Sequence, residues 1–127
     1  MRVFRVESGL SMEQLCEALG RLDAVALRPD AVESLEELEL AFHLAKKAFE
    51  NKKNIGKKLK YEFLLWLSGT RDIDSAIKKT SPRGDEFLLV VFSERKLPAE
   101  LKEKKTGLRR HGESLRLEMI SLSRIRS

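Results

Sequence analysis

The sequence predicts an α/β fold of the α+β type: a small sheet of three or more mostly antiparallel strands packed with helices, in a single domain spanning residues 1–127. Three observations support this prediction. The near-continuous apolar run at 86–92 is typical of a central strand covered on both faces. Apolar residues at helical spacing mark 35–50 as an amphipathic helix. The length of 127 residues suits one domain with its own core.

The first part of the chain predicts a strand, a helix and a second strand. Residues 2–6 are rich in side chains that favour strands. Ser11 and Gln14 have the spacing of a capping box and predict a helix whose apolar residues are Leu15, Leu19 and Leu22. Cys16 lies in this helix, where we expect a small buried hydrophobe. The apolar run 24–27 predicts the second strand.

The clearest predicted element is the helix at 35–50. Ser34 and Glu37 form a second capping-box pattern at its start. Its apolar residues are spaced three and four apart and predict one buried stripe made of Leu35, Leu38, Phe42, Ala45 and Phe49. His43 lies beside the stripe, and we expect it in solvent, without the positioned partners that a catalytic base needs.

A lysine-rich loop, a buried helix and a shorter helix are predicted next. The loop covers 51–58, and residues 59–67 are apolar on nearly all sides, which indicates a buried helix. We expect Gly69 to end that helix in the left-handed conformation. We expect Thr70 to cap the following helix, in which the inward-facing side chains would be Ile73, Ala76 and Ile77.

The last part of the chain gives a weaker pattern. Residues 81–85 predict a turn before the strand at 86–92, and Pro98 suggests a short helix at 97–101. Residues 106–112 are expected to form a connection, with His111 on an exposed loop. Beyond it, the apolar spacing fits a helix and a strand equally well, and periodicity leaves both open.

Composition excludes several classes of protein. The single cysteine allows neither an internal disulfide nor a cysteine-based zinc site, and two histidines leave little for a histidine metal site. No apolar run is long enough to span a membrane, and the N-terminus lacks the apolar segment of a signal peptide, so we expect a cytoplasmic protein. Few Asn and Gln beside many charged residues suggest heat adaptation.

The positive charge is concentrated in one segment. The net charge is +5, and residues 46–60 hold seven Lys and a single Glu. Lysines neutralise phosphates without regard to sequence, although a merely soluble loop is an equally good interpretation. Arg71 follows a Gly-containing break at a helix N-terminus, a place that attracts anions. A simple ion pair with Asp74 is the alternative, which spacing alone favours.

Residues 65–77, Leu-Trp-Leu-Ser-Gly-Thr-Arg-Asp-Ile-Asp-Ser-Ala-Ile, resemble the central motif of the kinase-binding subunit of the KEOPS/EKC tRNA-modification complex (the PRPK-binding protein family), in its archaeal type. The preceding helix, the Lys- and Asn-bearing loop and the strand at 87–92 look similar as well. Residues 117–122 look like the family's final helix, so the resemblance favours a helix there. The chain departs from the family between 93 and 113, where a strand found in relatives is not evident.

The resemblance implies a non-catalytic accessory subunit without cofactor or metal. It would bind the small atypical kinase/ATPase subunit and the 3′ CCA end of tRNA, supporting threonylcarbamoyladenosine modification. The expected tRNA-binding residues are Lys52, Lys53, Lys57, Lys58, Lys60, Ser68, Gly69, Thr70 and Arg71. The expected kinase contacts are Leu117, Ile120, Leu122 and Ile125.

Two other functions stay open at this point. One is a protein-interaction module that regulates the kinase without touching RNA. The other is a small enzyme that uses Arg71 and Asp74 on a phosphorylated metabolite, although the sequence offers no paired acid and base for that chemistry.

Overall fold

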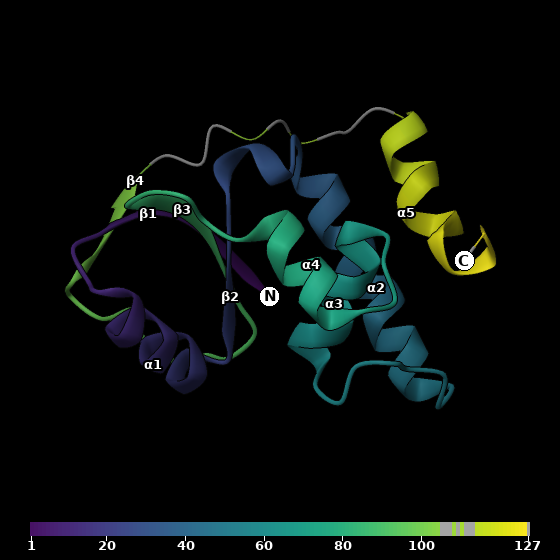
Figure 1. Ribbon diagram of the computed structural model, residues 1–127, viewed down its shortest axis with the longest axis horizontal. Helices are drawn as coiled ribbons and strands as arrows, with labels where there is room; N and C mark the ends of the chain where they lie inside the picture. The colour runs from purple at the N-terminus through teal and green to yellow at the C-terminus, as the bar shows by residue number, and fades with distance from the viewer. Residues whose placement is uncertain (105–107, 109, 111–113, 127) are drawn as a thin grey trace. The chain divides into compact units, whose positions relative to one another are not determined.

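The computed structural model describes residues 1–104, 108, 110 and 114–126, and in the last helix it describes the side chains of 116–122. The chain has an α+β fold, and contacts group it into two compact units (Figure 1). The sheet unit comprises residues 1–31 and 81–107, and the helical unit comprises 32–80 and 108–127. Neither unit is one continuous stretch of chain.

The sheet unit contains a four-stranded antiparallel sheet in the order β2-β3-β1-β4. Its strands are β1 (Arg2–Ser8), β2 (Ala24–Leu27), β3 (Glu86–Val91) and β4 (Leu101–Lys104). Arg2 lies opposite Val91 in the β1–β3 pair, and Glu7 lies opposite Glu86. The predicted antiparallel sheet is therefore confirmed.

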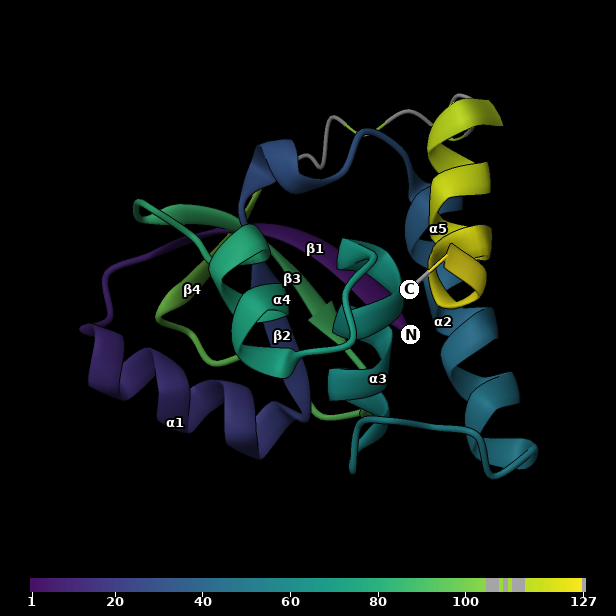
Figure 2. The ribbon, with the colours of Figure 1, turned by 45° about the vertical axis from the view of Figure 1, so that its right-hand side comes forward.

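Strand β3 occupies an inner position in this sheet. Its side chains from Phe87 to Val91 are each at most 1% exposed, so the strand is buried on both faces, as its apolar run predicts. Helix α1 (Met12–Leu22) packs beside the sheet (Figure 2), where its Leu15 and Leu22 join the core formed by Val6, Phe87, Leu89 and Val91. The predicted capping box of Ser11 and Gln14 begins this helix.

Two predictions for the sheet unit are wrong. Cys16 is exposed, because it follows the buried Leu15 on the outward face of α1. The predicted helix at 97–101 is replaced by a turn, in which Leu101 N–H donates to Pro98 O at 3.1 Å, and by β4. This strand lies in the region where none is evident from the sequence. After Leu101 its side chains are Lys and Glu and are exposed, as is common at sheet edges. The strand therefore has no apolar pattern that the sequence could reveal.

The helical unit consists of α2 (Leu35–Glu50), α3 (Leu59–Ser68), α4 (Ile73–Thr80) and α5 (Ser114–Arg126). Helix α2 packs against α3 and α5, and α3 also packs against α4. The C-terminal segment is thus a helix, as the resemblance favours. His111 and most of the predicted connection at 106–112 lie outside the described residues.

The buried face of α2 differs slightly from the predicted stripe. Leu38 and Ala45 are fully buried, and Ala41 and Ala48 join them, whereas the other predicted members, Leu35, Phe42 and Phe49, are half-buried. Small alanines allow close approach of the neighbouring helices, and the bulky side chains flank the contact. His43 lies in solvent as expected.

Glu37 is also buried on this face, only 2% exposed. Its Oε2 accepts hydrogen bonds from the backbone N–H groups of Glu33 and Ser34, both at 2.9 Å, and from Ser34 Oγ at 3.1 Å. Its Oε1 accepts from Arg116 Nε of α5 at 2.8 Å. One carboxylate therefore caps α2 and ties it to α5.

Candidate nucleic-acid interface

The lysine-rich segment is exposed at the end of α2 and in the loop that follows. Lys52 adopts a left-handed backbone with φ of 56°. Its N–H donates to Phe49 O at 3.1 Å, and Lys53 N–H donates to Ala48 O at 2.8 Å, which is the hydrogen-bond pattern of a Schellman motif. This helix end turns the chain sharply and presents to solvent the side chains of Lys46, Lys47, Lys52, Lys53, Lys57 and Lys58.

A buried glutamate holds the second half of this loop. Glu62 lies in the first turns of α3 and is 0% exposed. Its Oε1 accepts from Ile55 N–H at 2.9 Å and from Gly56 N–H at 2.8 Å, and its Oε2 accepts from Trp66 Nε1 at 3.1 Å. Sequence reasoning missed this residue. A glutamate within a helix that is apolar on all sides must be buried, and therefore partnered, and this signal could have found it.

The loop lies directly against the start of α3. A Cβ atom at Gly56 would lie 2.8 Å from Glu62 N, closer than real Cβ atoms come to a backbone, and 3.1 Å from Tyr61 C, which is also a tight contact. Asn54 Nδ2 donates to Gly56 O at 2.9 Å and closes the turn. Only glycine fits this approach without moving the helix or the loop.

The break between α3 and α4 has the geometry that the sequence predicts at Gly69. This residue has φ of 70°, and Thr70 N–H donates to Leu65 O at 3.2 Å across the helix end. The predicted cap of α4 is wrong by two residues. Asp72, and not Thr70, accepts from Ser75 N–H at 3.1 Å, while the Thr70 hydroxyl bonds Ser68 Oγ at 3.1 Å.

The Asp72 carboxylate is solvent-exposed and stays ionised readily. The Ser75 hydroxyl donates to it at 2.8 Å, and this hydrogen bond, followed by that of the Ser75 N–H, holds the pKa of Asp72 below its ordinary value of 3.8. The α4 N-terminus is therefore already served by an anionic cap from its own chain.

An open pocket of about 480 Å³ joins the loop to this break. Two cationic residues from separate segments, Lys57 and Arg71, line it, together with the aromatic ring of Tyr61 and aliphatic side chains. The remaining lining residues are Ile55, Gly56, Leu65, Asp72, Ile73 and Ile77. Ile77 was expected to face inward but is 42% exposed. Positive charge beside apolar and aromatic surface suits an unstacked nucleotide.

The structure does not place all the predicted tRNA-binding residues together. Lys52, Lys53, Lys57, Lys58 and Arg71 are exposed, and Gly69 is exposed between the half-buried Ser68 and Thr70. Lys60 is 9% exposed, with its Nζ 5.4 Å from the centroid of the Tyr61 ring. Because α3 begins at Leu59, this lysine belongs to a packed helix and not to the exposed loop.

The predicted kinase-contact residues on α5 differ in exposure. Ile120 is 6% exposed and belongs to the core of the helical unit, while Leu117 and Leu122 are half-buried. The side chain of Ile125 lies outside the described residues. Met119, which the sequence reasoning did not select, is 60% exposed. Within residues 116–122, Met119 is therefore the most exposed apolar side chain of this helix, and the predicted contact residue Ile120 is buried.

No family model matches the chain, and no curated protein matches it.

Among the described residues, no group of three or more His, Cys, Asp and Glu side chains is arranged as a metal ion would require. None of the described helices is long and apolar enough to cross a membrane.

Proposed function

We propose that the protein is a non-catalytic accessory subunit that binds tRNA and a small atypical kinase of the KEOPS type. The observation that carries the proposal is the pocket in which Lys57 and Arg71 meet apolar and aromatic walls. Five of its lining residues belong to the motif at 65–77 that resembles the KEOPS kinase-binding subunit: Leu65, Arg71, Asp72, Ile73 and Ile77. The proposal rests on this resemblance and on the chemistry of the pocket.

The two halves of the site would contact different parts of an RNA. The exposed lysines of 46–58 would neutralise backbone phosphates, a contact that does not depend on sequence. The pocket would hold a nucleotide of the single-stranded 3′ CCA end, with Arg71 donating to phosphate or to a base edge and Tyr61 providing a flat apolar wall. Phosphate contacts would thus position the RNA, and the pocket would select a free end.

The first test measures tRNA binding by matched charge reversals. Lys57→Glu with Lys58→Glu should weaken binding at least about tenfold and reduce the salt slope by about 1.4, since each phosphate contact contributes about 0.7 for single strands. The matched control is Lys96→Glu with Lys102→Glu, two exposed lysines of the sheet unit, which changes the net charge equally. Equal losses for the two pairs would show that only the overall charge matters.

A second arm tests the pocket with the RNA itself. A tRNA transcript that lacks its CCA end should bind several-fold more weakly than the intact transcript, and Arg71→Ala should remove most of that difference. If the wild-type chain binds neither tRNA at low salt nor the kinase, the proposed function is wrong.

Binding of the kinase alone is the alternative function. The 60% exposed Met119 on α5, beside the half-buried Leu117 and Leu122, favours a protein contact that needs no RNA. Under this alternative the kinase co-purifies with the chain, tRNA does not, and the lysine reversals change neither result.

A further inference from the structure

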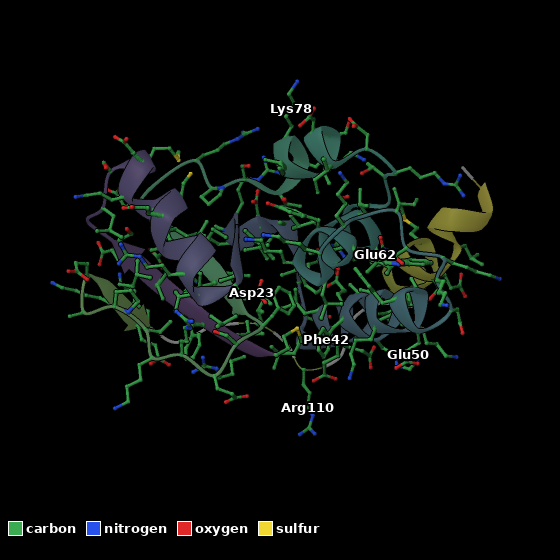
Figure 3. All side chains as sticks on the ribbon, turned by 90° about the horizontal axis from the view of Figure 1, so that it is seen from below. Asp23, Phe42, Glu50, Glu62, Lys78 and Arg110 are labelled. Carbon is green, nitrogen blue, oxygen red and sulfur yellow. The ribbon has the colours of Figure 1, made fainter. Side chains whose placement is uncertain are left out.

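Glu62 is an unusual residue to find buried in the first turns of a packed helix. A carboxylate that is 0% exposed is costly unless hydrogen bonds replace its water. An apolar residue would serve the packing of α3 as well. Figure 3 labels the Glu62 side chain among the helices of the helical unit. The presence of a carboxylate there is explained by the groups that donate hydrogen bonds to its oxygens.

The oxygens of Glu62 hold the loop that carries the lysines. Two successive backbone N–H groups, those of Ile55 and Gly56, converge on Oε1 at 2.9 and 2.8 Å. Two hydrogen bonds to one atom fix the orientation of both peptide planes. Lys57 is the next residue, and its position at the pocket follows from that orientation.

The close packing of Gly56 on α3 adds a second restraint. Since a Cβ at this position would lie 2.8 Å from Glu62 N, the loop and the helix are in direct contact where the hydrogen bonds form. Trp66 Nε1 holds the other carboxylate oxygen at 3.1 Å and so limits rotation of the Glu62 side chain.

We infer that Glu62 is a positioning residue for RNA binding, because its buried carboxylate shapes residues 55–57 so that Lys57 lines the pocket together with Arg71. This inference rests on the proposed function. Glu62 does not touch the RNA, and its negative charge is buried among the groups that it holds.

The direction in which Glu62→Gln changes RNA affinity distinguishes a positioning role from a simple effect of charge. Glu62→Gln removes one negative charge near the lysines, and by charge alone it should strengthen RNA binding. Positioning predicts the opposite, about tenfold weaker binding to an unmodified tRNA transcript, because the amide cannot accept from the two loop N–H groups and from Trp66 together. Glu50→Gln is the matched control, since Glu50 is exposed at the end of α2, and it should bind equally or slightly more tightly.

A double-mutant cycle shows whether Glu62 acts through the lysines. Lys57→Ala should weaken binding several-fold in the wild type and by a factor near one in the Glu62→Gln background. Hydrogen exchange at Ile55 and Gly56 should accelerate in Glu62→Gln, and the fluorescence of Trp66, the single tryptophan, should change. If Glu62 had a merely structural role, the losses of RNA-binding free energy in Glu62→Gln and Lys57→Ala would add in the double variant.

Two further variants control for folding. Leu38→Ala destabilises the buried face of α2 near the start of the helix and leaves the residues of the loop unchanged, and where it remains folded it should bind RNA within about twofold of the wild type. Gly56→Ala leaves Glu62 intact but displaces the loop, so it should reproduce the weaker binding. It also keeps the inference testable if Glu62→Gln fails to fold.

The possible failures are distinguishable. If the wild-type chain does not bind tRNA, the proposed function is wrong and the positioning role falls with it. If the wild type binds but Glu62→Gln binds as tightly as Glu50→Gln, or if the cycle is additive, the positioning role alone is wrong. Weaker binding of both Glu62→Gln and Gly56→Ala, with coupling to Lys57, supports it.

Discussion

Replacing Arg116 tests how the C-terminal helix is held to the rest of the helical unit. Arg116→Met keeps most of the side-chain length but removes the guanidinium that donates to Glu37 Oε1 at 2.8 Å. The carboxylate, 2% exposed, would keep its three hydrogen bonds to Oε2 and lose the one from a cation. A hydrogen bond to a charged group contributes about 1.5–3 kcal/mol, and burial of the acceptor favours the upper half of that range.

The free energy of unfolding, measured with urea, gives the comparison. We expect Arg116→Met to lower it by about 2–3 kcal/mol. The additional contact of Arg116 with Glu33, at 3.6 Å between half-exposed side chains, contributes little. The control is Arg21→Met, which removes an exposed ion pair with Glu17 at 3.9 Å and should cost less than about 0.5 kcal/mol.

Equal destabilisation by Arg116→Met and Arg21→Met would refute this reasoning, because burial of Glu37 would then carry no energetic weight. Replacing Glu37 by methionine in the Arg116→Met background should not restore stability. Although it removes the unpaired charge, it also leaves the N–H groups of Glu33 and Ser34 without their acceptor.

Three further outcomes follow from the described geometry. Hydrogen bonds from Ser75 hold the pKa of Asp72 below 3.8. The Asp72 cap of α4 therefore stabilises the folded state at pH values above 3.8, and this stabilisation is lost as the pH falls through the folded-state pKa. Ser75→Ala should raise the pKa of Asp72 toward 3.8, which carboxyl NMR measures. Gly69→Ala should cost about 1–2 kcal/mol in urea unfolding, since φ of 70° strains a side chain, and no loss would contradict this conformation. Phe63→Ala, at a site 0% exposed, should cost about 3–5 kcal/mol, and a loss below 1 kcal/mol would show that the site is not packed.

Helices α1 to α4 and most strands could be predicted because their signals are local, whereas periodicity left α5 open between a helix and a strand. Capping boxes at Ser11 and Ser34 and the left-handed Gly69 each depend on residues a few positions apart, and the structure has all three. Strand β4 could not be found in this way. Its pairing with β1 depends on a distant part of the chain, and its polar side chains are those of an exposed edge.

The candidate site could be predicted only in part for the same reason. The exposed lysines follow from composition, but the burial of Lys60 depends on where α3 begins. The pocket depends on contact between residues 55–61 and 71–77, which no local pattern reports. Glu62 was overlooked because charged residues are usually solvated, and its partners are backbone groups that every sequence has.

The order of the strands determines when β1 can pair during synthesis and how cleavage of the chain would divide the two units. Strand β1 pairs with β3 and β4, and its Arg2 lies opposite Val91 in the β1–β3 pair. The whole segment 32–80 is therefore synthesised before either pairing partner of β1 leaves the ribosome. During that interval β1, which carries the apolar side chains of Val3, Phe4 and Val6, has free edges, which is a hazard for aggregation. For the same reason a single cleavage between 80 and 81 would leave each unit made of two peptides held together by noncovalent contacts, whereas a cleavage between 31 and 32 would divide the sheet unit and leave the helical unit on one peptide.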